Sequence, residues 1–259
     1  MIILMGMIQQ LYPTFAKNCM KTLCVDLGNT RMKAAIFEDG NIIEVSAIDG
    51  DVLSSVHALI EKYHPQKSIL SSVIHHDQGI ENILSASTQF HLLNHQSKLN
   101  FSLAVGKPDT MGADRLALAA AVVHFFPGKN NLVIGLGSCI TYNFINQSGI
   151  FLGGSISPGL EMRLKSLKDY TALLPLVEKE WNFPLIGYDT KTNILSGVIW
   201  GMAKEIEGIV AAYEEKYGNF NVVLTGGDCT YFERLLKNKI FADPDLLFKG
   251  LYAISETNN

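Results

Sequence analysis

Residues 25–42 read VDLGNTRMKAAIFEDGNI, and residues 134–151 read IGLGSCITYNFINQSGIF. A single offset of 109 residues brings two pairs of glycines into register, Gly28 with Gly137 and Gly40 with Gly149. Each copy follows the same order of strand, glycine turn, strand, glycine turn and strand. This internal repeat predicts two related α/β lobes, each of which begins with an antiparallel meander.

The apolar pattern on either side of these copies predicts the remaining elements. Short apolar runs between turn residues indicate strands, and apolar residues that recur every three or four positions indicate helices. The predicted strands are 21–25, 32–37, 41–45, 68–73, 131–136, 140–146, 150–156 and 221–225, and the predicted helices are 52–63, 80–86, 113–126 and 190–217. We therefore predict an α/β fold with mixed sheets, an N-terminal lobe at 20–111 and a C-terminal lobe at 112–259.

The composition limits the class of protein. With 47% hydrophobic and 18% charged residues, the 259-residue chain can bury a sizeable core, as a globular protein does. Its net charge of −4 and the lack of a basic stripe argue against a nucleic-acid partner. Residues 131–160 carry no charge, but their glycines, proline and polar side chains are unlike a membrane-spanning helix, and no membrane partner is expected.

Two features indicate where the protein resides. The four cysteines form no CxxC pair, which is typical of free thiols in a reducing compartment. Residues 1–19 are apolar but have neither a basic n-region nor a clear cleavage site, so a signal peptide is not predicted. We expect a cytoplasmic protein in which residues 1–19 form an extension without function.

The glycine turns have a chemical use beyond linking strands. Consecutive backbone N–H groups in such turns cradle phosphate oxygens, and two facing turns would grip a polyphosphate. Asp26 ends the first strand, where a carboxylate can hold Mg²⁺, and Lys33 adds positive charge nearby. Gly226-Gly227 is a further glycine turn after a strand. The alternative interpretation is an ordinary β-hairpin in which Asp26 is only a turn-former.

A second segment, GADR at residues 112–115, suits an acceptor substrate. Asp114 lies at the start of a predicted helix and could serve as the base for an alcohol. Arg115 can bind a carboxylate through two hydrogen bonds. The alternatives are that Asp114 only stabilises the helix N-terminus and that Arg115 is a surface residue.

Taken together, these segments resemble the type III pantothenate kinases. The matching motifs are DLGNT (26–30), GADR (112–115), GSCITYNF (137–144), GGSISPGLEMRLKSL (153–167), TALLP (171–175), GYDTKTNILSG (187–197) and LTGGD (224–228). The resemblance implies two ribonuclease-H-like lobes of the actin/hexokinase-like fold with a cleft between them. It also implies a homodimer that phosphorylates pantothenate with ATP and Mg²⁺, the first step of coenzyme A synthesis.

The resemblance assigns roles to individual residues. It implies Asp114 as the base at the pantothenate hydroxyl. It implies a segment for ATP and Mg²⁺ that consists of Asp26, Leu27, Gly28, Asn29, Thr30, Arg31, Met32 and Lys33, together with Ser138 in the second turn. It implies further contacts to pantothenate from Gly112, Ala113, Arg115 and Thr190.

Three positions depart from the family pattern. The family has an aspartate for a monovalent cation (K⁺ or NH₄⁺) where this chain has Gly135, and a carboxylate where it has Asn143. Its substrate-contacting tyrosine is replaced by Val105. We therefore expect weak stimulation by K⁺ or NH₄⁺. These losses leave open a catalytically weak homologue that acts as a regulatory or accessory binding protein. Another actin-like sugar or acid kinase is a further alternative, which would leave GGxIxPG and TAxLP unexplained.

Overall fold

The computed structural model describes residues 19–237 and 240–259, so the predicted extension lies, except for Cys19, outside the described residues. The strands are β1 (Lys21–Leu27), β2 (Met32–Glu38), β3 (Asn41–Ala47), β4 (Lys67–Ser72), β5 (Gln89–Leu92), β6 (Ser102–Leu103), β7 (Asn131–Leu136), β8 (Cys139–Ile145), β9 (Ile150–Pro158), β10 (Asn221–Thr225) and β11 (Phe241–Ala242). The helices are α1 (Val52–Tyr63), α2 (Gln78–Ser87), α3 (Ala113–Phe125), α4 (Leu160–Asp169), α5 (Thr190–Tyr217), α6 (Cys229–Leu235) and α7 (Leu246–Asn258), with a 3₁₀ turn at Pro108–Thr110.

The two sheets repeat one topology. The first has the order β3-β2-β1-β4-β5, and the second has the order β11-β10-β7-β8-β9-β6. In each, an antiparallel meander is extended by a parallel strand next to its first strand: β4 pairs with β1, and β10 with β7. The duplication predicted from the sequence is thus present in the strand order, and β6 is an addition to the second sheet.

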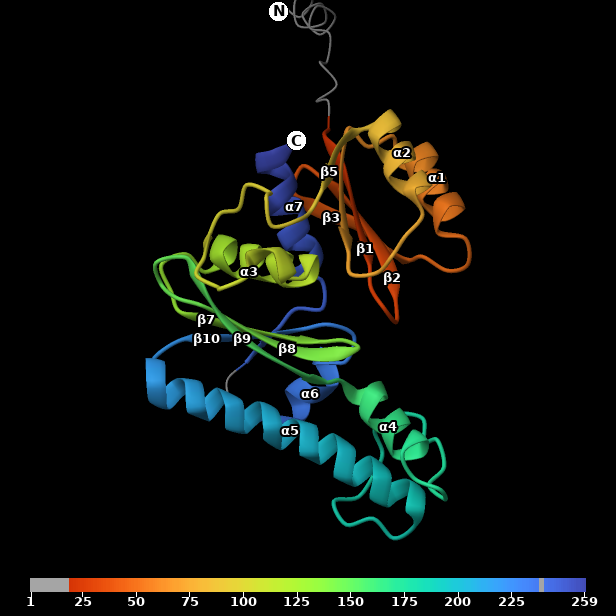
Figure 1. Cartoon of the computed structure of the whole chain (residues 1–259), viewed down its shortest axis with the longest axis vertical. Coiled ribbons are helices and arrows are strands. Elements are labelled where there is room, and N and C mark those ends of the chain that lie inside the picture. The colour runs from red at the N-terminus through yellow and green to blue at the C-terminus, as the bar shows by residue number, and fades with distance from the viewer. Residues whose placement is uncertain (1–18, 238–239) are drawn as a thin grey trace, which may run out of the picture.

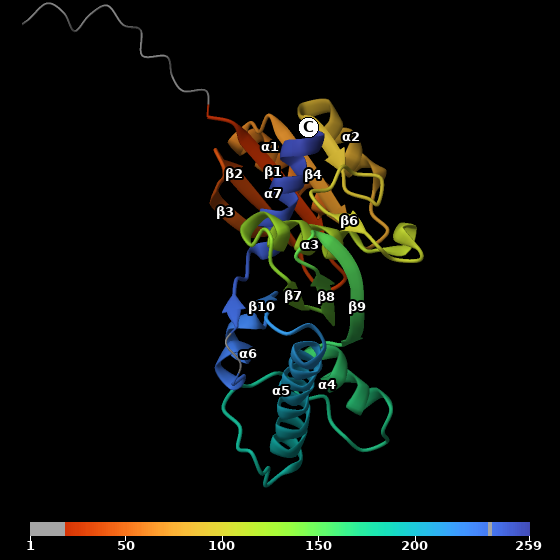
Figure 2. The ribbon, with the colours of Figure 1, turned by 90° about the vertical axis from the view of Figure 1, so that its left-hand side faces the viewer.

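The molecule is built in alternating layers (Figures 1 and 2). Helices α1 and α2 cover one face of the first sheet, and α3 and α7 cover the other. The opposite side of the α3–α7 layer packs on the second sheet, whose far face is covered by α4, α5 and α6. Because α3 lies between two sheets, Leu116 to Val122 are all buried, as an apolar, alanine-rich helix requires.

The strand residues divide between the layers with a period of two. In β1, Leu23, Val25 and Leu27 face α1 and α2, whereas Cys24 faces α3 and α7. Asp26 shares the face of Cys24, so alternation alone turns its carboxylate toward the space between the lobes.

Helices α3 and α7 touch backbone to backbone. A Cβ at Gly250 would overlap the carbonyl oxygen of Ala117, so only glycine permits this approach. Phe37 of β2 stacks on Tyr252 of α7 with ring centroids 4.5 Å apart. The last helix therefore joins the first sheet to the centre of the molecule.

The predicted fold class is confirmed, and the predicted strands and helices correspond to elements of the structure. The sequence patterns missed the short strands β5, β6 and β11 and the helices α6 and α7, and of α4 they indicated only a possible start near Pro158. The lobe boundary between residues 111 and 112 stays a prediction. In the part of the chain that the structure describes, no helix is both long enough and apolar enough to span a bilayer.

Candidate functional site

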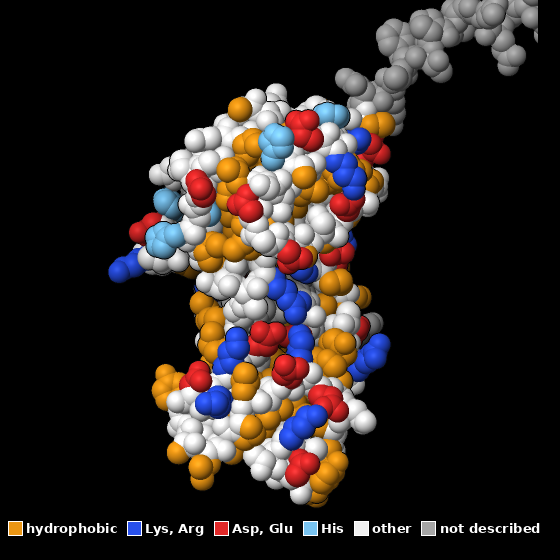
Figure 3. Space-filling view, turned by 90° about the vertical axis from the view of Figure 1, so that its right-hand side faces the viewer, with side chains coloured by type: hydrophobic (Ala, Val, Ile, Leu, Met, Phe, Trp, Pro, Cys, Tyr) orange, Lys and Arg blue, Asp and Glu red, His pale blue; other side chains and the backbone are white. Residues whose placement is uncertain are grey.

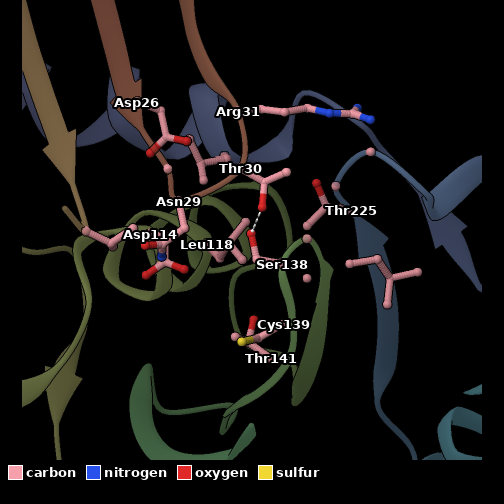
Figure 4. A pocket seen from close by; sticks show the side chains of 18 of the residues that line it. Asp26, Asn29, Thr30, Arg31, Asp114, Leu118, Ser138, Cys139, Thr141 and Thr225 are labelled. Atoms are coloured by element: carbon pink, nitrogen blue, oxygen red, sulfur yellow. Dashed lines mark hydrogen bonds between the residues drawn. The ribbon is translucent and has the colours of Figure 1, made fainter. Parts of the chain in front are cut away.

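A cleft opens between the two sheets, at the ends of β1 and β7 (Figure 4). It is bounded by the glycine turns after β1, β7 and β10, by the first turn of α3 and by the beginning of α7. The predicted site residues that line it are Asp26, Gly28, Asn29, Thr30, Arg31, Lys33, Gly112, Asp114, Arg115, Gly135 and Ser138. The structure therefore brings segments that are far apart in the sequence to one cavity.

The duplicated turns meet in this cleft. The hydroxyls of Thr30 and Ser138 form a hydrogen bond of 2.5 Å, one from each turn. The Gly226-Gly227 turn also lines the cleft and directly follows Thr225, which lies on the opposite side from Asp26 and Asp114 (Figure 4). Three glycine turns with backbone N–H donors thus surround one space, an arrangement that suits a chain of phosphates.

Asp26 is a buried carboxylate at the end of β1. Its pKa is raised from 3.8 to about 6, mainly by burial and also by the negative charge of Asp114, whereas the hydrogen bond from Ser71 and the charge of Lys33 oppose the rise. The Ser71 hydroxyl donates to Asp26 Oδ1 at 2.8 Å. A carboxylate that is costly to ionise in the free protein is stabilised by a cation placed beside it.

Asp114 and Arg115 lie in the first turn of α3. Gly112 precedes them, and a Cβ there would lie 2.5 Å from Asp114 Oδ1, so any larger residue would displace the Asp114 carboxylate. Burial raises the pKa of Asp114, while a backbone hydrogen bond from Arg115 and the Arg115 charge oppose the rise. The Arg115 Nε donates to Asn143 Oδ1 at 2.6 Å. The pair thus offers a proton acceptor beside a cation, both facing the cleft.

Five predicted site residues do not line the cleft. The side chains of Leu27, Met32 and Ala113 pack in the hydrophobic layers, so only their backbones lie near it. Val105 packs against the α3 layer, in the segment between β6 and the 3₁₀ turn. Thr190 begins α5, at the end of the second lobe remote from α3 (Figure 1). Within one chain, Thr190 is not brought near Asp114.

Other residues that line the cleft were not identified from the sequence patterns. Thr225 is 3% exposed, lines the cleft, and its hydroxyl has no hydrogen-bond partner among the described residues. Leu247 and Phe248, at the start of α7, add an apolar wall. Nothing in the run Leu246 to Phe248 distinguishes a cleft wall from core, whereas Thr225 precedes a glycine pair and could have been found from that position.

The donor set of the cleft fits Mg²⁺ that accompanies a nucleotide. The described residues contain no cluster of three or more His, Cys, Asp or Glu that could hold a metal by themselves. Mg²⁺ is commonly held by one or two carboxylates with water and phosphate oxygens. Asp26, buried near a second carboxylate, that of Asp114, has the chemistry that such a ligand requires.

Comparison with solved structures supports the fold. A Baf family transcriptional activator from Campylobacter jejuni superimposes with a TM-score of 0.58 at 21% identity, over 91% of this chain and 98% of that one. A 2-dehydro-3-deoxygalactonokinase protein from Sinorhizobium meliloti gives 0.56 at 16% identity, with the same coverage. A ROK family glucokinase from Streptomyces griseus, in complex with glucose and AMPPNP, gives 0.51 at 14%. These likenesses show that the chain has the two-lobed α/β fold of these proteins.

The family follows from the sequence comparisons. A family model of type III pantothenate kinase matches residues 22–212. A type III pantothenate kinase from Christiangramia forsetii is 41% identical over 91% of this chain and 98% of its own length, and one from Bacteroides fragilis is 40% identical over 92% and 98%. The chain belongs to the type III pantothenate kinase family, which confirms the resemblance and the prediction of a kinase.

Proposed function

We propose that this chain transfers the γ-phosphoryl group of ATP to the primary hydroxyl of pantothenate and so forms 4'-phosphopantothenate for coenzyme A synthesis. The observation that carries the proposal is that the duplicated turns and the GADR segment of a type III pantothenate kinase face the same cleft. The alternatives of an accessory protein or of another sugar or acid kinase have no comparable support.

On the acceptor side, Asp114 and Arg115 have separate roles, one as the base and the other as the binding group for the substrate. Asp114 accepts the proton of the pantothenate hydroxyl, whose oxygen bonds to the γ-phosphorus as the bond to the bridging oxygen of ADP breaks. The raised pKa of Asp114 makes it a stronger base than an exposed carboxylate. Arg115 binds the pantothenate carboxylate and holds the hydroxyl in line with the phosphorus.

On the nucleotide side, the backbone N–H groups of the turns at residues 28–31 and 137–139 hold the phosphates. Asp26 holds the Mg²⁺ of the nucleotide, directly or through water, and Lys33 contributes charge. The bound ion supplies charge neutralisation on the phosphates. The Leu247 and Phe248 wall suits the apolar faces of the base. Because Gly135 has no carboxylate, we do not assign a K⁺ or NH₄⁺ ligand there.

We infer that the enzyme is a homodimer. The second lobe exposes large apolar side chains around α4 and the following loop (Figure 3), a pattern that is uncommon in monomers. These side chains, with their exposed fractions, are Tyr170 (89%), Leu173 (94%), Leu185 (70%), Ile186 (83%) and Tyr188 (82%). Sedimentation velocity tests this inference: the chain is 28.5 kDa, and a species of monomer mass at micromolar concentration would contradict it.

We also place the enzyme in the cytoplasm, where ATP is available. The four cysteines, Cys19, Cys24, Cys139 and Cys229, are all free, as a reducing compartment favours.

The deciding experiment is a coupled assay of ADP release with purified protein, ATP, Mg²⁺ and pantothenate, with the product identified by mass spectrometry. We expect ADP and phosphopantothenate in equal amounts, and no ADP release when pantothenate is omitted. ATP binding without turnover at any Mg²⁺ or Mn²⁺ concentration would favour an accessory protein. Turnover with a sugar or sugar acid instead would favour another kinase of this fold.

A further inference from the structure

Two carboxylates stand at the end of the cleft where the third glycine turn lies. Asp228 directly follows Gly226-Gly227 and is 8% exposed, and Glu161 lies in the first turn of α4. Both residues line the cleft. A carboxylate and a phosphate repel each other, and more strongly where water is excluded. These two charges would therefore oppose the binding of a triphosphate unless a cation neutralised them.

Lys179 supplies such a cation. It lies in the loop between α4 and α5, and its Nζ donates to Asp228 Oδ1 at 2.8 Å and is 4.0 Å from Glu161 Oε1. Within residues 19–237 and 240–259, no other lysine or arginine forms a salt bridge with either carboxylate. Lys179 itself does not line the cleft. It thus cancels charge at the cleft wall without taking the space of a phosphate.

The chain on either side holds Lys179 in place. Val177, two residues before it, is 5% exposed and belongs to the core of the second lobe. Trp181, two residues after it, stacks on Tyr231 of α6 with ring centroids 3.9 Å apart. Helix α6 begins directly after Asp228. Because the backbone is fixed on both sides, this ion pair costs less conformational entropy than a pair between two mobile surface side chains.

The same pairing bears on an arginine of the first lobe. Arg31 lines the cleft, and a Cβ at Gly227 would lie 2.9 Å from Arg31 Nη1, so the guanidinium reaches the neighbour of Asp228. In the part of the chain that the structure describes, Arg31 forms no salt bridge. An unpaired Asp228 carboxylate would compete with a phosphate for this guanidinium, and Lys179 removes that competitor.

We propose that Lys179 is a positioning residue that neutralises Asp228 and Glu161, so that this end of the cleft accepts the polyanionic part of a nucleotide. It acts through the charge of its two neighbours and touches no substrate, and it leaves Arg31 available to the phosphates. The inference rests on the proposed function, in which the cleft binds ATP, and it adds a residue that the cleft geometry alone does not indicate.

Calorimetric titration of wild type and Lys179→Met with ATP and Mg²⁺ tests the proposal. The substitution keeps an apolar stem but removes the charge, so we expect Kd for ATP to rise by about tenfold while kcat at saturating ATP changes by less than about twofold. We expect the ratio of the two Kd values to fall when NaCl is raised from about 0.05 M to about 0.5 M, because salt screens the repulsion. A ratio that does not depend on salt would mean that Lys179 only supports the shape of the turn, and would overturn the proposal.

Asp228→Asn gives the opposite expectation and covers the case in which Lys179→Met does not fold. The amide oxygen still accepts the hydrogen bond from Lys179 but leaves the lysine charge uncompensated, so we expect Kd for ATP to fall by about 2- to 5-fold. In the double variant, Kd should return to within about threefold of wild type, since neither charge remains. An unchanged or higher Kd in Asp228→Asn, or a double variant no better than Lys179→Met, would overturn the proposal.

Lys204→Met is the matched control. Lys204 forms an exposed salt bridge with Glu207 within α5, and neither residue lines the cleft. The net charge changes as much as in Lys179→Met, so an equal rise of Kd in this control would also overturn the proposal. Because the acceptor takes no part in these titrations, ATP binding without turnover of pantothenate would contradict the proposed function alone. Absence of ATP binding by wild type would contradict both.

Discussion

Thr30 and Ser138, 108 residues apart in the sequence, join their hydroxyls in a hydrogen bond of 2.5 Å across the cleft. One residue belongs to the turn after β1, and the other belongs to the turn after β7. The contact brings the two copies of the repeat within reach of one phosphate group, so both hydroxyls can turn toward a nucleotide when it enters.

The first prediction concerns this pair. Ser138→Ala removes a donor to the phosphates, and we expect KM for ATP to rise by about 2- to 10-fold, the worth of one hydrogen bond, with a smaller effect on KM for pantothenate. Ser148→Ala is the control, because Ser148 is an exposed residue in the other turn of the same meander. Initial-rate kinetics with each substrate varied provide the measurement. Equal effects on both KM values would argue against a nucleotide contact.

The second prediction concerns the proposed base. Asp114→Asn keeps the shape of the side chain but cannot accept a proton, so we expect kcat to fall by about 10²- to 10⁴-fold with nucleotide binding retained. Asp109→Asn, an exposed carboxylate in the neighbouring 3₁₀ turn, should have the wild-type rate. The measurement is single-turnover phosphorylation together with ATP titration. A wild-type kcat in Asp114→Asn would make Asp114 a structural residue.

The third prediction concerns the pH dependence of stability. The pKa of Asp26 is raised from 3.8 to about 6 in the folded protein, so the folded state resists ionisation of this group. The resulting penalty is absent below pH 3.8, grows as pH rises toward 6, and is complete above pH 6. We therefore expect Asp26→Asn to be more stable than wild type at pH 8 by about 1–3 kcal/mol, and no more stable near pH 4.

Urea unfolding at the two pH values, without nucleotide or Mg²⁺, measures this difference. Asp49→Asn, which alters an exposed carboxylate, should leave the stability unchanged. The Asp26 variant should also lose activity, because the buried carboxylate that lowers the stability of the folded protein is the group proposed to hold Mg²⁺. Lower stability of Asp26→Asn at pH 8 would mean that the hydrogen bond from Ser71 outweighs the cost of burial.

The fourth prediction concerns monovalent cations. A Cβ at Gly135 would lie 2.8 Å from Thr141 Oγ1 and 3.2 Å from Leu118 Cδ1, so the space beside this glycine is already filled. We expect little stimulation of wild type by K⁺ or NH₄⁺ over Na⁺ at constant ionic strength. Strong stimulation would show that other oxygen ligands bind the cation.

The crowding between position 135 and the Thr141 hydroxyl also predicts how a carboxylate could be introduced at position 135. Gly135→Asp alone should lose about 1–3 kcal/mol of stability through overpacking. Thr141→Ala should recover part of that loss in the double variant, because it removes the crowded hydroxyl. Thermal unfolding of the two single variants and the double variant measures the coupling, and strict additivity would contradict the crowding.

Much of this architecture could be predicted because its signals are local. The glycine turns, the period-two strands and the long helix α5 each depend on residues close in sequence, and the offset of 109 exposed the duplication. The segments at Asp26, Asp114 and Ser138 could be placed near one cleft by the repeat together with the family resemblance.

What could not be predicted depends on distant partners. Helix α7 has no capping side chain and an apolar pattern that fits a strand or a helix, and it is fixed by α3 and the first sheet. The bond from Ser71 to Asp26 follows from parallel pairing of β4 with β1, which a sequence pattern does not reveal. Thr190 looked like a substrate residue by motif alone, yet in one chain α5 begins away from the cleft.

The return of α7 to the first sheet has a consequence for biosynthesis. During translation, the face of the N-terminal sheet with Cys24 and Phe37 is incompletely covered until α7, which is synthesised long after this sheet, completes the layer. A nascent chain released before α7 is made would therefore expose a hydrophobic surface, which chaperones and proteases recognise. The layer over this face of the first sheet is therefore completed only after residues 246–258 have been synthesised.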